Sequence, residues 1–308
     1  MTPLLFKFPA HIYEIGWVEF IPLPSHLTGR YLSSHLTSTY LHHFRGRDPS
    51  MWWVDLLNMN HPQFSIITPC YNAEDWLQGC YQCLLTQSIA DWEWLVIDDG
   101  STDNSSQLLN DLSYSDDRVK PLFISRNSGA GVARNVGLET AQGQYLAFLD
   151  VDDVWLPEKL AAQLVLMEEG VMLSFTAYRI CDHRGLVKGT VDENTPNRVG
   201  RHDLLMKRVT MGCSTVMVRK ELIGQRRFPT MRRGQDYLFW LNLLEIAGEA
   251  VKVNKVMTEY RIRPGSISRN KFRKAAGQWS MYRGPLHISL WVSAFYFFHY
   301  AKNAVFRK

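Results

Sequence analysis

From residue 64 onward, short apolar runs alternate with longer stretches of helical periodicity. The apolar runs have the length of buried strands and lie at residues 64–69, 92–97, 119–124 and 144–149. The stretches between them place apolar side chains on one helical face and lie at residues 74–88, around 108–112 and at 130–141. The alternation predicts βαβ units, and therefore an α/β fold with a mixed, mostly parallel sheet and helices on both faces.

The same alternation continues beyond Pro157. It predicts a helix at 158–168, strands near 172–174 and 214–218, and a helix at 236–246. No internal repeat or low-complexity linker interrupts it, so we expect one domain from 62 to 285. Residues 1–61 show no sustained period, and we expect an N-terminal extension that is poorly ordered or an artefact of the start site, with translation beginning at Met59.

Composition and charge narrow the class of protein. The 308 residues carry a net charge of +4 with the basic residues spread along the chain, which gives no track for nucleic acid. An odd count of five cysteines argues against a disulfide framework and for a reducing compartment. Cys80 and Cys83 form a C-x-x-C pair, but no second pair completes a metal site, so we expect structural thiols. With no signal sequence or spanning apolar run, we expect a cytoplasmic location.

Polar clusters follow four successive predicted strands. They begin at Tyr71, Asp98, Arg126 and Asp150. Because ligands of parallel α/β sheets bind beyond the carboxyl ends of the strands, four such clusters predict one site. In the last of them, Asp150, Asp152 and Asp153 can converge on a hard divalent cation, Mn²⁺ or Mg²⁺. The alternative is a strand end followed by a helix cap.

The segment 128–135 contains two glycines and resembles a dinucleotide-binding fingerprint. It fails in detail, because Arg134 stands where the third glycine belongs and the segment follows the third strand. The glycines therefore predict close approach of the backbone to a ligand, with Arg134 available for a phosphate group. No G-x-x-x-x-G-K-[ST] sequence is present, which argues against a P-loop NTPase.

Together these motifs resemble the family 2, GT-A-fold inverting glycosyltransferases. The segments that carry the resemblance are 66–74, 96–103, 127–137 and 148–153, in the order and spacing of that family. The likeness covers roughly residues 64 to 265, and within the family it is greatest to the teichuronic-acid type, which builds bacterial cell-surface polysaccharides. It implies a nucleotide-sugar donor, with UDP as the expected nucleotide, and a saccharide acceptor.

The resemblance also implies roles for particular residues. Pro69 and Tyr71 would pack on the nucleobase, and Asp99 would hydrogen-bond it. Asp150 would contact the ribose or the sugar. Asp152 would bind the metal that bridges the diphosphate, with Asp153 as a helper.

The general base is expected on a later helix. Asp236 matches the second position of the family's Glu-Asp motif, although Gln235 replaces the usual Glu. The alternative is that Asp236 only caps its helix. Arg261 and Arg263 lie in a segment that resembles a loop of the family, which can close over the donor phosphates. The alternative is a basic surface loop.

These parts suit a single displacement. Asp236 would deprotonate an acceptor hydroxyl while the metal neutralises the departing nucleoside diphosphate. Processive members of the family carry a Gln-x-x-Arg-Trp motif and a bundle of spanning helices, and the sequence has neither, so we expect one sugar per encounter. The competing hypotheses are a sugar nucleotidyltransferase and a non-catalytic nucleotide-sugar binding module.

The segment 286–308 predicts an amphipathic helix. Leu290, Trp291, Phe297 and Phe298 fall on its apolar face, and Ser293, Tyr296, Tyr300 and Asn303 on the other. Aromatic residues followed by lysine and arginine are typical of an interfacial helix on an anionic membrane. We therefore expect peripheral association with the inner face of the plasma membrane and a lipid-linked acceptor, with docking on the chain's own domain or a dimer contact as alternatives.

Overall fold

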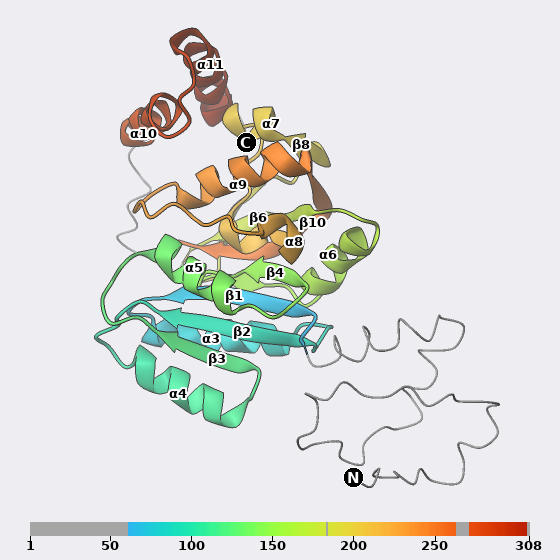
Figure 1. Ribbon diagram of the computed structural model, residues 1–308. Coiled ribbons are helices and arrows are strands. Elements are labelled where there is room, and N and C mark those ends of the chain that lie inside the picture. The colour runs from blue at the N-terminus through green and yellow to red at the C-terminus, as the bar shows by residue number, and fades with distance from the viewer. Residues whose placement is uncertain (1–60, 183, 263–270, 307–308) are drawn as a thin grey trace, which may run out of the picture. The chain divides into compact units, whose positions relative to one another are not determined.

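The computed structural model describes residues 61–182, 184–262 and 271–306 (Figure 1). The expectations for residues 1–60 and for Arg263 lie outside these residues. The elements, in chain order, are β1 (Phe64–Cys70), α3 (Glu74–Leu85), β2 (Trp92–Asp98), α4 (Ser105–Ser115), β3 (Val119–Phe123), α5 (Ala130–Thr140), β4 (Tyr145–Phe148), β5 (Val154–Trp155), α6 (Lys159–Glu168), β6 (Leu173–Cys181), β7 (Val187–Val191), β8 (Arg198–Gly200), α7 (Arg201–Leu205), the 3₁₀ helix η2 (Cys213–Thr215), β9 (Met217–Arg219), α8 (Lys220–Ile223), α9 (Gln235–Ala247), β10 (Glu249–Arg261), α10 (Lys271–Arg283) and α11 (Leu290–Phe306).

Within the described residues, ten strands form one mixed sheet in the order β3-β2-β1-β4-β9-β6-β10-β5, with β7 beside β6 and β8 beside β10. Strands β3, β2, β1 and β4 are parallel to one another, and β6 is parallel to β10. β9 lies antiparallel between β4 and β6 and joins these two parallel groups. The expectation of a mixed, mostly parallel sheet is confirmed.

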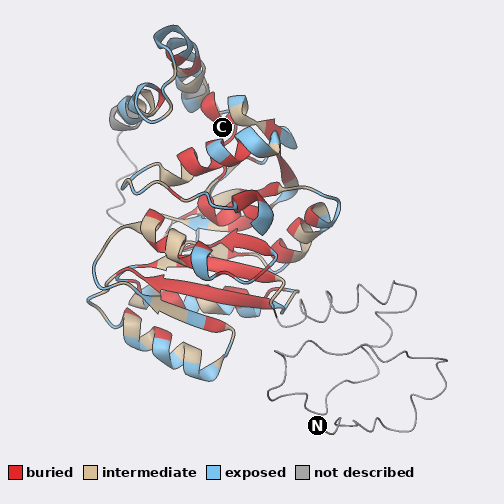
Figure 2. Ribbon diagram, viewed as in Figure 1, coloured by how far each residue is buried: buried red, intermediate tan, exposed pale blue. Residues whose placement is uncertain are grey.

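The central strands are buried along their length (Figure 2). Alternate side chains belong to two separate cores: Ile66 and Trp94 pack with helices α3, α4 and α6, whereas Ile67 and Leu95 pack with α5 and α9. Helices therefore cover both faces, which is why these strands read as continuous apolar runs.

The strand register brings the predicted polar clusters together. Cys70 of β1 pairs with Asp98 of β2, and Ile67 of β1 pairs with Phe148 of β4. The backbone continues this alignment beyond the strands, because the N–H of Asp99 donates to the carbonyl of Cys70 at 2.8 Å. The residues after β1, β2 and β4 consequently lie at one edge of the sheet.

Helix α9 is fixed on β4 by aromatic side chains. Phe148 of β4 contacts Phe228 and Trp240 edge-on, with ring centroids 5.5 and 5.4 Å apart. Phe239 stacks on Phe228 with a centroid distance of 4.0 Å. This cluster holds the first turn of α9, which carries Asp236, near the strand that leads into Asp150.

Helices α10 and α11 pack on the rest of the domain through polar, tyrosine and apolar side chains. Tyr282, Ser293 and Tyr296 are buried, Phe297 packs against the core, and Asn303 donates to the carbonyl of Met206 at 2.9 Å. Ser293, Tyr296 and Asn303, which the sequence predicts on the polar face of the helix, thus lie toward the domain. The domain boundary at 285 stays a prediction.

The opposite side of α11 is open to solvent. Trp291 is 83% exposed and Phe298 is 67% exposed, and Leu290, Val292 and Phe295 are about half exposed. In the part of the chain that the structure describes, none of the helices has both the length and the apolar character needed to cross a bilayer.

Several elements of the structure were not predicted from the sequence, or were predicted with different bounds. The strand expected at 214–218 begins with the 3₁₀ turn η2 and is extended only from Met217 to Arg219. Strand β10 and helix α10 were not predicted, because neither carries a clear apolar period. All five cysteines are buried and none forms a disulfide, as expected of structural thiols.

Gly143 provides a test of how closely the chain packs ahead of β4. A Cβ there would overlap the backbone nitrogen of Ser65, a contact that no side-chain rotation can relieve. We expect Gly143→Ala to lower the free energy of unfolding by about 2 kcal/mol or more, measured by urea denaturation. Gly79→Ala is the matched control, because its Cβ would meet nothing within 4 Å on an exposed position of α3 and should stabilise the helix by about 0.5–1 kcal/mol. Equal stability of the two variants would contradict this account.

Candidate active site

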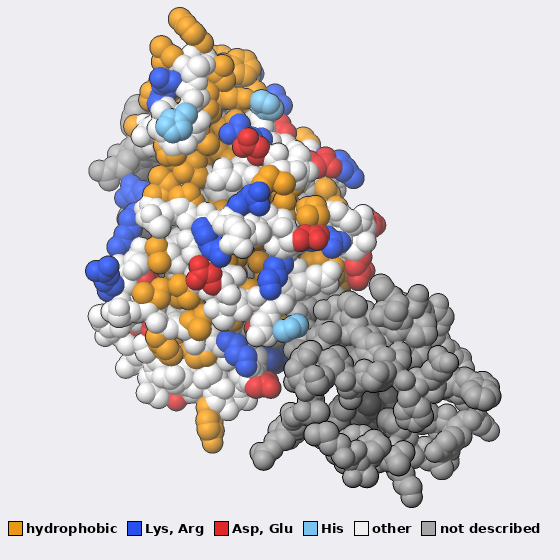
Figure 3. Space-filling view, in the orientation of Figure 1, with side chains coloured by type: hydrophobic (Ala, Val, Ile, Leu, Met, Phe, Trp, Pro, Cys, Tyr) orange, Lys and Arg blue, Asp and Glu red, His pale blue; other side chains and the backbone are white. Residues whose placement is uncertain are grey.

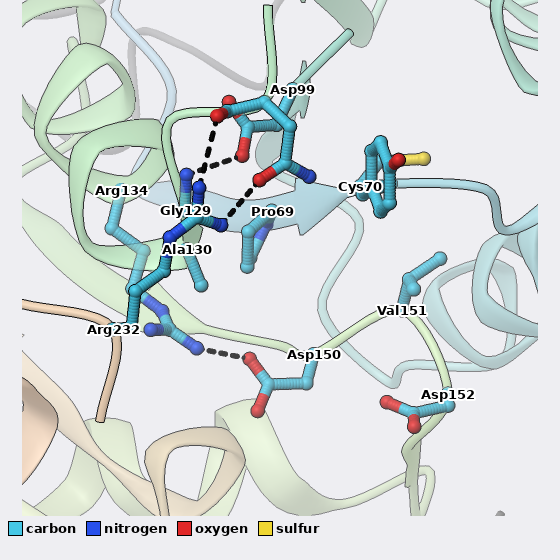
Figure 4. Close-up of a pocket in the computed structure, with 12 residues that line it drawn as sticks. Pro69, Cys70, Asp99, Gly129, Ala130, Arg134, Asp150, Val151, Asp152 and Arg232 are labelled. Carbon is cyan, nitrogen blue, oxygen red and sulfur yellow. Dashed lines mark hydrogen bonds and ion pairs between the residues drawn. The ribbon is translucent and has the colours of Figure 1, made fainter. Parts of the chain in front are cut away.

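An open pocket of about 300 Å³ lies at the carboxyl edge of β1, β2 and β4 (Figure 4). Six of the residues predicted for the site line it, namely Pro69, Tyr71, Asp99, Arg134, Asp150 and Asp152. Its other lining residues are Cys70, Asn127, Gly129, Ala130, Val151 and Arg232. A second hollow, beside Gln144 and Lys220, lies at the amino end of β4, away from these carboxylates.

Asp99 fixes the loop that forms one wall of the pocket. Its buried carboxylate accepts the backbone N–H of Ser128 at 2.8 Å and that of Gly129 at 2.6 Å. Gly129 has a φ of 98°, a conformation that favours glycine. Carboxylate oxygens can accept further bonds, so the role of Asp99 toward a nucleobase stays a prediction. Tyr71 is 44% exposed on the same pocket.

Arg134 and Asp150 form an ion pair, with 2.5 Å between Nη2 and Oδ1. The guanidinium is 4% exposed and lies 5.6 Å over the ring of Phe228. Burial acts to lower the pKa of Arg134, but the neighbouring Cys213, Asp150 and Asp236 raise it overall. Arg134 therefore stays charged, and the carboxylate of Asp150 turns toward it (Figure 4).

Ser214 of η2 holds the loop that carries the three aspartates. Its hydroxyl accepts the N–H of Asp150 at 3.0 Å and donates to the Asp153 carboxylate at 2.5 Å. The Ser214 carbonyl in turn accepts the indole N–H of Trp155 at 2.7 Å. No sequence pattern indicated a role for Ser214, because its contacts lie about 60 residues away along the chain.

Asp153 faces into the protein. It is 2% exposed and accepts bonds from the Ser214 hydroxyl and, at 3.3 Å, from the backbone N–H of Arg261. Burial, and then repulsion from Asp150 and Asp152, raise the pKa of Asp153 well above its usual value. Its assignment as a metal ligand stays a prediction, and its contacts are those of a residue that braces the loop.

The carboxylates here suit a divalent cation that is bound together with the phosphates of the donor. Asp152 lines the pocket and is partly exposed, whereas Asp150 is engaged by Arg134. Over residues 61–182, 184–262 and 271–306, no group of three or more His, Cys, Asp or Glu could hold an ion. Mg²⁺ is commonly bound by one or two carboxylates together with substrate phosphates, and the carboxylate chemistry here suits that mode.

The charge of the predicted base acts on Tyr260, near the end of β10. Burial, and then the carboxylates of Asp153, Asp152, Asp150 and Asp236 in that order, raise the pKa of Tyr260 to about 12. Asp236 is not among the residues that line the pocket, and its role as the base stays a prediction.

Gly131 explains how α9 begins so close to the pocket. A Cβ at Gly131 would lie 2.8 Å from the carbonyl oxygen of Pro229 and 3.2 Å from Cγ of Gln235. The first turn of α5 therefore packs directly against the segment that leads into α9. At Gly131 the missing side chain lets α5 approach the segment that leads into α9. The prediction that the glycines of this segment let the backbone approach a ligand stays a prediction.

The fold and this pocket define a glycosyltransferase of the GT-A class. The chain belongs to glycosyl transferase family 2, whose family model matches residues 65–226. It is similar to the Bacillus subtilis protein named as teichuronic acid biosynthesis glycosyltransferase TuaG, with 39% identity over 247 residues, 79% of this chain and 96% of that protein.

A second relative is the Escherichia coli UDP-Glc:alpha-D-GlcNAc-diphosphoundecaprenol beta-1,3-glucosyltransferase WfgD. It is 34% identical over 219 residues, which are 70% of this chain and 84% of WfgD. Among solved structures, Staphylococcus aureus TarS in complex with UDP-GlcNAc matches with a TM-score of 0.61 at 20% identity, covering 79% of this chain and 73% of that one. The expected family and GT-A fold are confirmed.

Replacing Ser214 by alanine tests its role in holding the aspartate loop. The variant removes two hydrogen bonds to the loop at almost constant volume, and a hydrogen bond to a charged group is worth about 1.5–3 kcal/mol. We expect the Mn²⁺ concentration for half-maximal donor turnover, and the Mn²⁺ dissociation constant, to rise about tenfold.

Thr258→Val is the control for the Ser214 variant. It removes only the 3.3 Å contact to the Ser214 carbonyl and should leave the metal dependence within about twofold of wild type. A Ser214→Ala protein with wild-type metal affinity would show that the loop holds its shape without this hydroxyl.

Proposed function

We propose that the chain transfers one sugar from a UDP-sugar to a hydroxyl of a lipid-linked saccharide, with inversion and with Mn²⁺ or Mg²⁺ bound. The observation that carries the proposal is the pocket at the carboxyl edge of the sheet, in which Tyr71 and Asp99 lie together with Asp150 and Asp152. Asp236, in the first turn of α9, is the separate acid of the proposal. A nucleotide pocket next to a metal-type carboxylate and a separate acid is what a single displacement needs.

The bond changes assign one task to each group. The acceptor oxygen attacks the anomeric carbon, its proton passes to the Asp236 carboxylate, and the bond to the nucleoside diphosphate breaks. A bound divalent cation would neutralise the charge that develops on the leaving diphosphate. Asp152 would hold that cation, and Asp150, oriented by Arg134, would face the ribose or the sugar.

The relatives support the donor and acceptor classes. WfgD is named for UDP-Glc and for an acceptor attached to diphosphoundecaprenol, and TarS was solved with UDP-GlcNAc. TuaG is named for teichuronic acid biosynthesis. The proposal extends these classes to this chain, with a role in bacterial cell-surface polysaccharide synthesis.

The variant Asp236→Asn tests the base. It keeps the shape of the side chain but cannot take the acceptor proton, so we expect kcat of sugar transfer to fall by about 10²–10⁴-fold. UDP affinity, measured separately, should not change. Glu245→Gln, an exposed position on the same helix, is the matched control and should keep wild-type activity.

Two outcomes would contradict these assignments. Nearly full transfer by Asp236→Asn would place the base elsewhere. Wild-type protein that binds a nucleotide sugar yet turns it over with no acceptor would favour the non-catalytic binding module.

Helix α11 supports a membrane location for the acceptor. Its exposed face gathers Trp291, Phe295 and Phe298, and Figure 3 shows hydrophobic side chains collected over this end of the molecule. The sequence from residue 260 to 308 contains ten Lys and Arg residues and no Asp or Glu. An apolar face with a purely cationic segment complements anionic lipid, so we propose peripheral association with the inner face of the plasma membrane.

Flotation with anionic phospholipid vesicles tests this surface. The double variant Trp291→Ser, Phe298→Ser should lose most of its binding, because it removes the two most exposed aromatic residues of α11. Tyr114→Ser, which changes a 96% exposed residue on α4, is the control and should float as wild type does. Equal flotation of all three proteins would reject α11 as the anchor, and self-association without vesicle binding would assign the face to a second copy of the chain.

A further inference from the structure

Arg232 lies in the pocket, although nothing in the sequence pattern had selected it. It belongs to the segment between α8 and α9, four residues before Asp236. Its side chain is exposed and lines the same pocket as Asp150 and Asp152. Figure 4 shows Arg232 rising beside Arg134 toward the wall that carries Gly129 and Asp99.

The two pocket arginines differ in how their charge is matched. Arg134 is buried and paired with the carboxylate of Asp150. Arg232 instead donates from Nη1 to Oδ1 of Asn127 and from Nη2 to the Asn127 carbonyl at 3.1 Å. Both partners are neutral, and in the part of the chain that the structure describes no carboxylate pairs with Arg232. Arg232 therefore brings to the pocket a positive charge that no carboxylate of the described residues balances.

The side chain of Arg232 lies along the neighbouring loop. A Cβ at Gly129 would lie 3.5 Å from Cδ of Arg232 and 3.7 Å from its Nη1, which are ordinary van der Waals distances. The loop is itself held by the two bonds from Ser128 and Gly129 to Asp99. A guanidinium has five N–H donors, and the two bonds to Asn127 leave others for a ligand.

We propose that Arg232 binds the diphosphate of the donor. The inference rests on the proposed function, because it takes the anionic ligand of the pocket to be a nucleoside diphosphate. A planar guanidinium pairs well with two phosphate oxygens, and such charge-assisted bonds are about twice as strong as neutral ones. Arg232 thus supplies a positive charge to the pocket that Asp150 and Asp152 line, where Asp152 would hold the cation.

The test compares UDP with uridine, which share the base and ribose but differ in the phosphates. Binding of each is titrated calorimetrically in the presence of Mn²⁺, with uridine measured by competition where it binds weakly. We expect Arg232→Ala to weaken UDP binding about tenfold or more and to leave uridine binding unchanged. Arg232→Gln, which removes the charge but keeps an amide for Asn127, should weaken UDP binding in the same way.

Arg233→Ala is the matched control. Arg233 is also exposed and adjacent in sequence, but it does not line the pocket, so its loss should leave both affinities unchanged. The control also reports any general effect of net charge on nucleotide binding.

Each contrary result is distinct. Wild-type affinity for UDP in Arg232→Ala, or an equal loss in Arg233→Ala, would overturn the proposal. An equal loss of UDP and uridine would also overturn it, because Arg232 would then act on the base or on the shape of the loop. Wild-type protein that binds neither compound would overturn the proposed donor itself, and this failure appears before any variant is made.

Discussion

The buried guanidinium of Arg134 is the constraint on which the arrangement of the site depends. A charge that is 4% exposed must be paired, and removing one partner of a buried pair costs about 3–5 kcal/mol. Asp150 is that partner, and the ring of Phe228 lies beneath the guanidinium. Phe228 also packs on Phe148 of β4 and Phe239 of α9. Arg134 of α5 therefore connects the aspartate loop to the aromatic cluster that packs against α9.

Because of this pairing, the three aspartates of the loop have different surroundings although their side chains are chemically identical. Asp150 is turned toward Arg134, and Asp153 is turned inward to Ser214, whereas Asp152 lines the pocket and is partly exposed. The arginines divide in the same way, because the buried one balances a carboxylate and the exposed Arg232 has neutral partners. The roles follow from burial and partners, which a sequence motif does not encode.

The sequence predicted what local patterns determine. Each of the strands β1, β2 and β4 ends in a polar cluster, and parallel strands end at the same edge of a sheet. This was enough to predict that Tyr71, Asp99 and Asp150 lie at one edge. It did not predict the partner of Arg134 or the role of Ser214, because those contacts join segments far apart in the chain and no spacing signals them. Arg232 left a weak signal, since an arginine pair stands one residue before Gln235 and Asp236. The faces of α11 were predicted, but their orientation depended on the Tyr296 hydroxyl and the Asn303 amide finding partners on α7 and directly after it.

The orientation of α11 connects the two ends of the proposed reaction. Tyrosine and asparagine side chains can satisfy hydrogen bonds on the protein, which leaves Trp291, Phe295 and Phe298 outward, where lipid or another apolar surface can cover them. Helix α10, which packs against α11, also contacts the start of α9, because Gln278 donates to the Tyr237 hydroxyl at 2.8 Å. The helices that carry the apolar face thus adjoin the turn that carries Asp236. An acceptor held at a membrane by its lipid would then meet the base without leaving the bilayer surface.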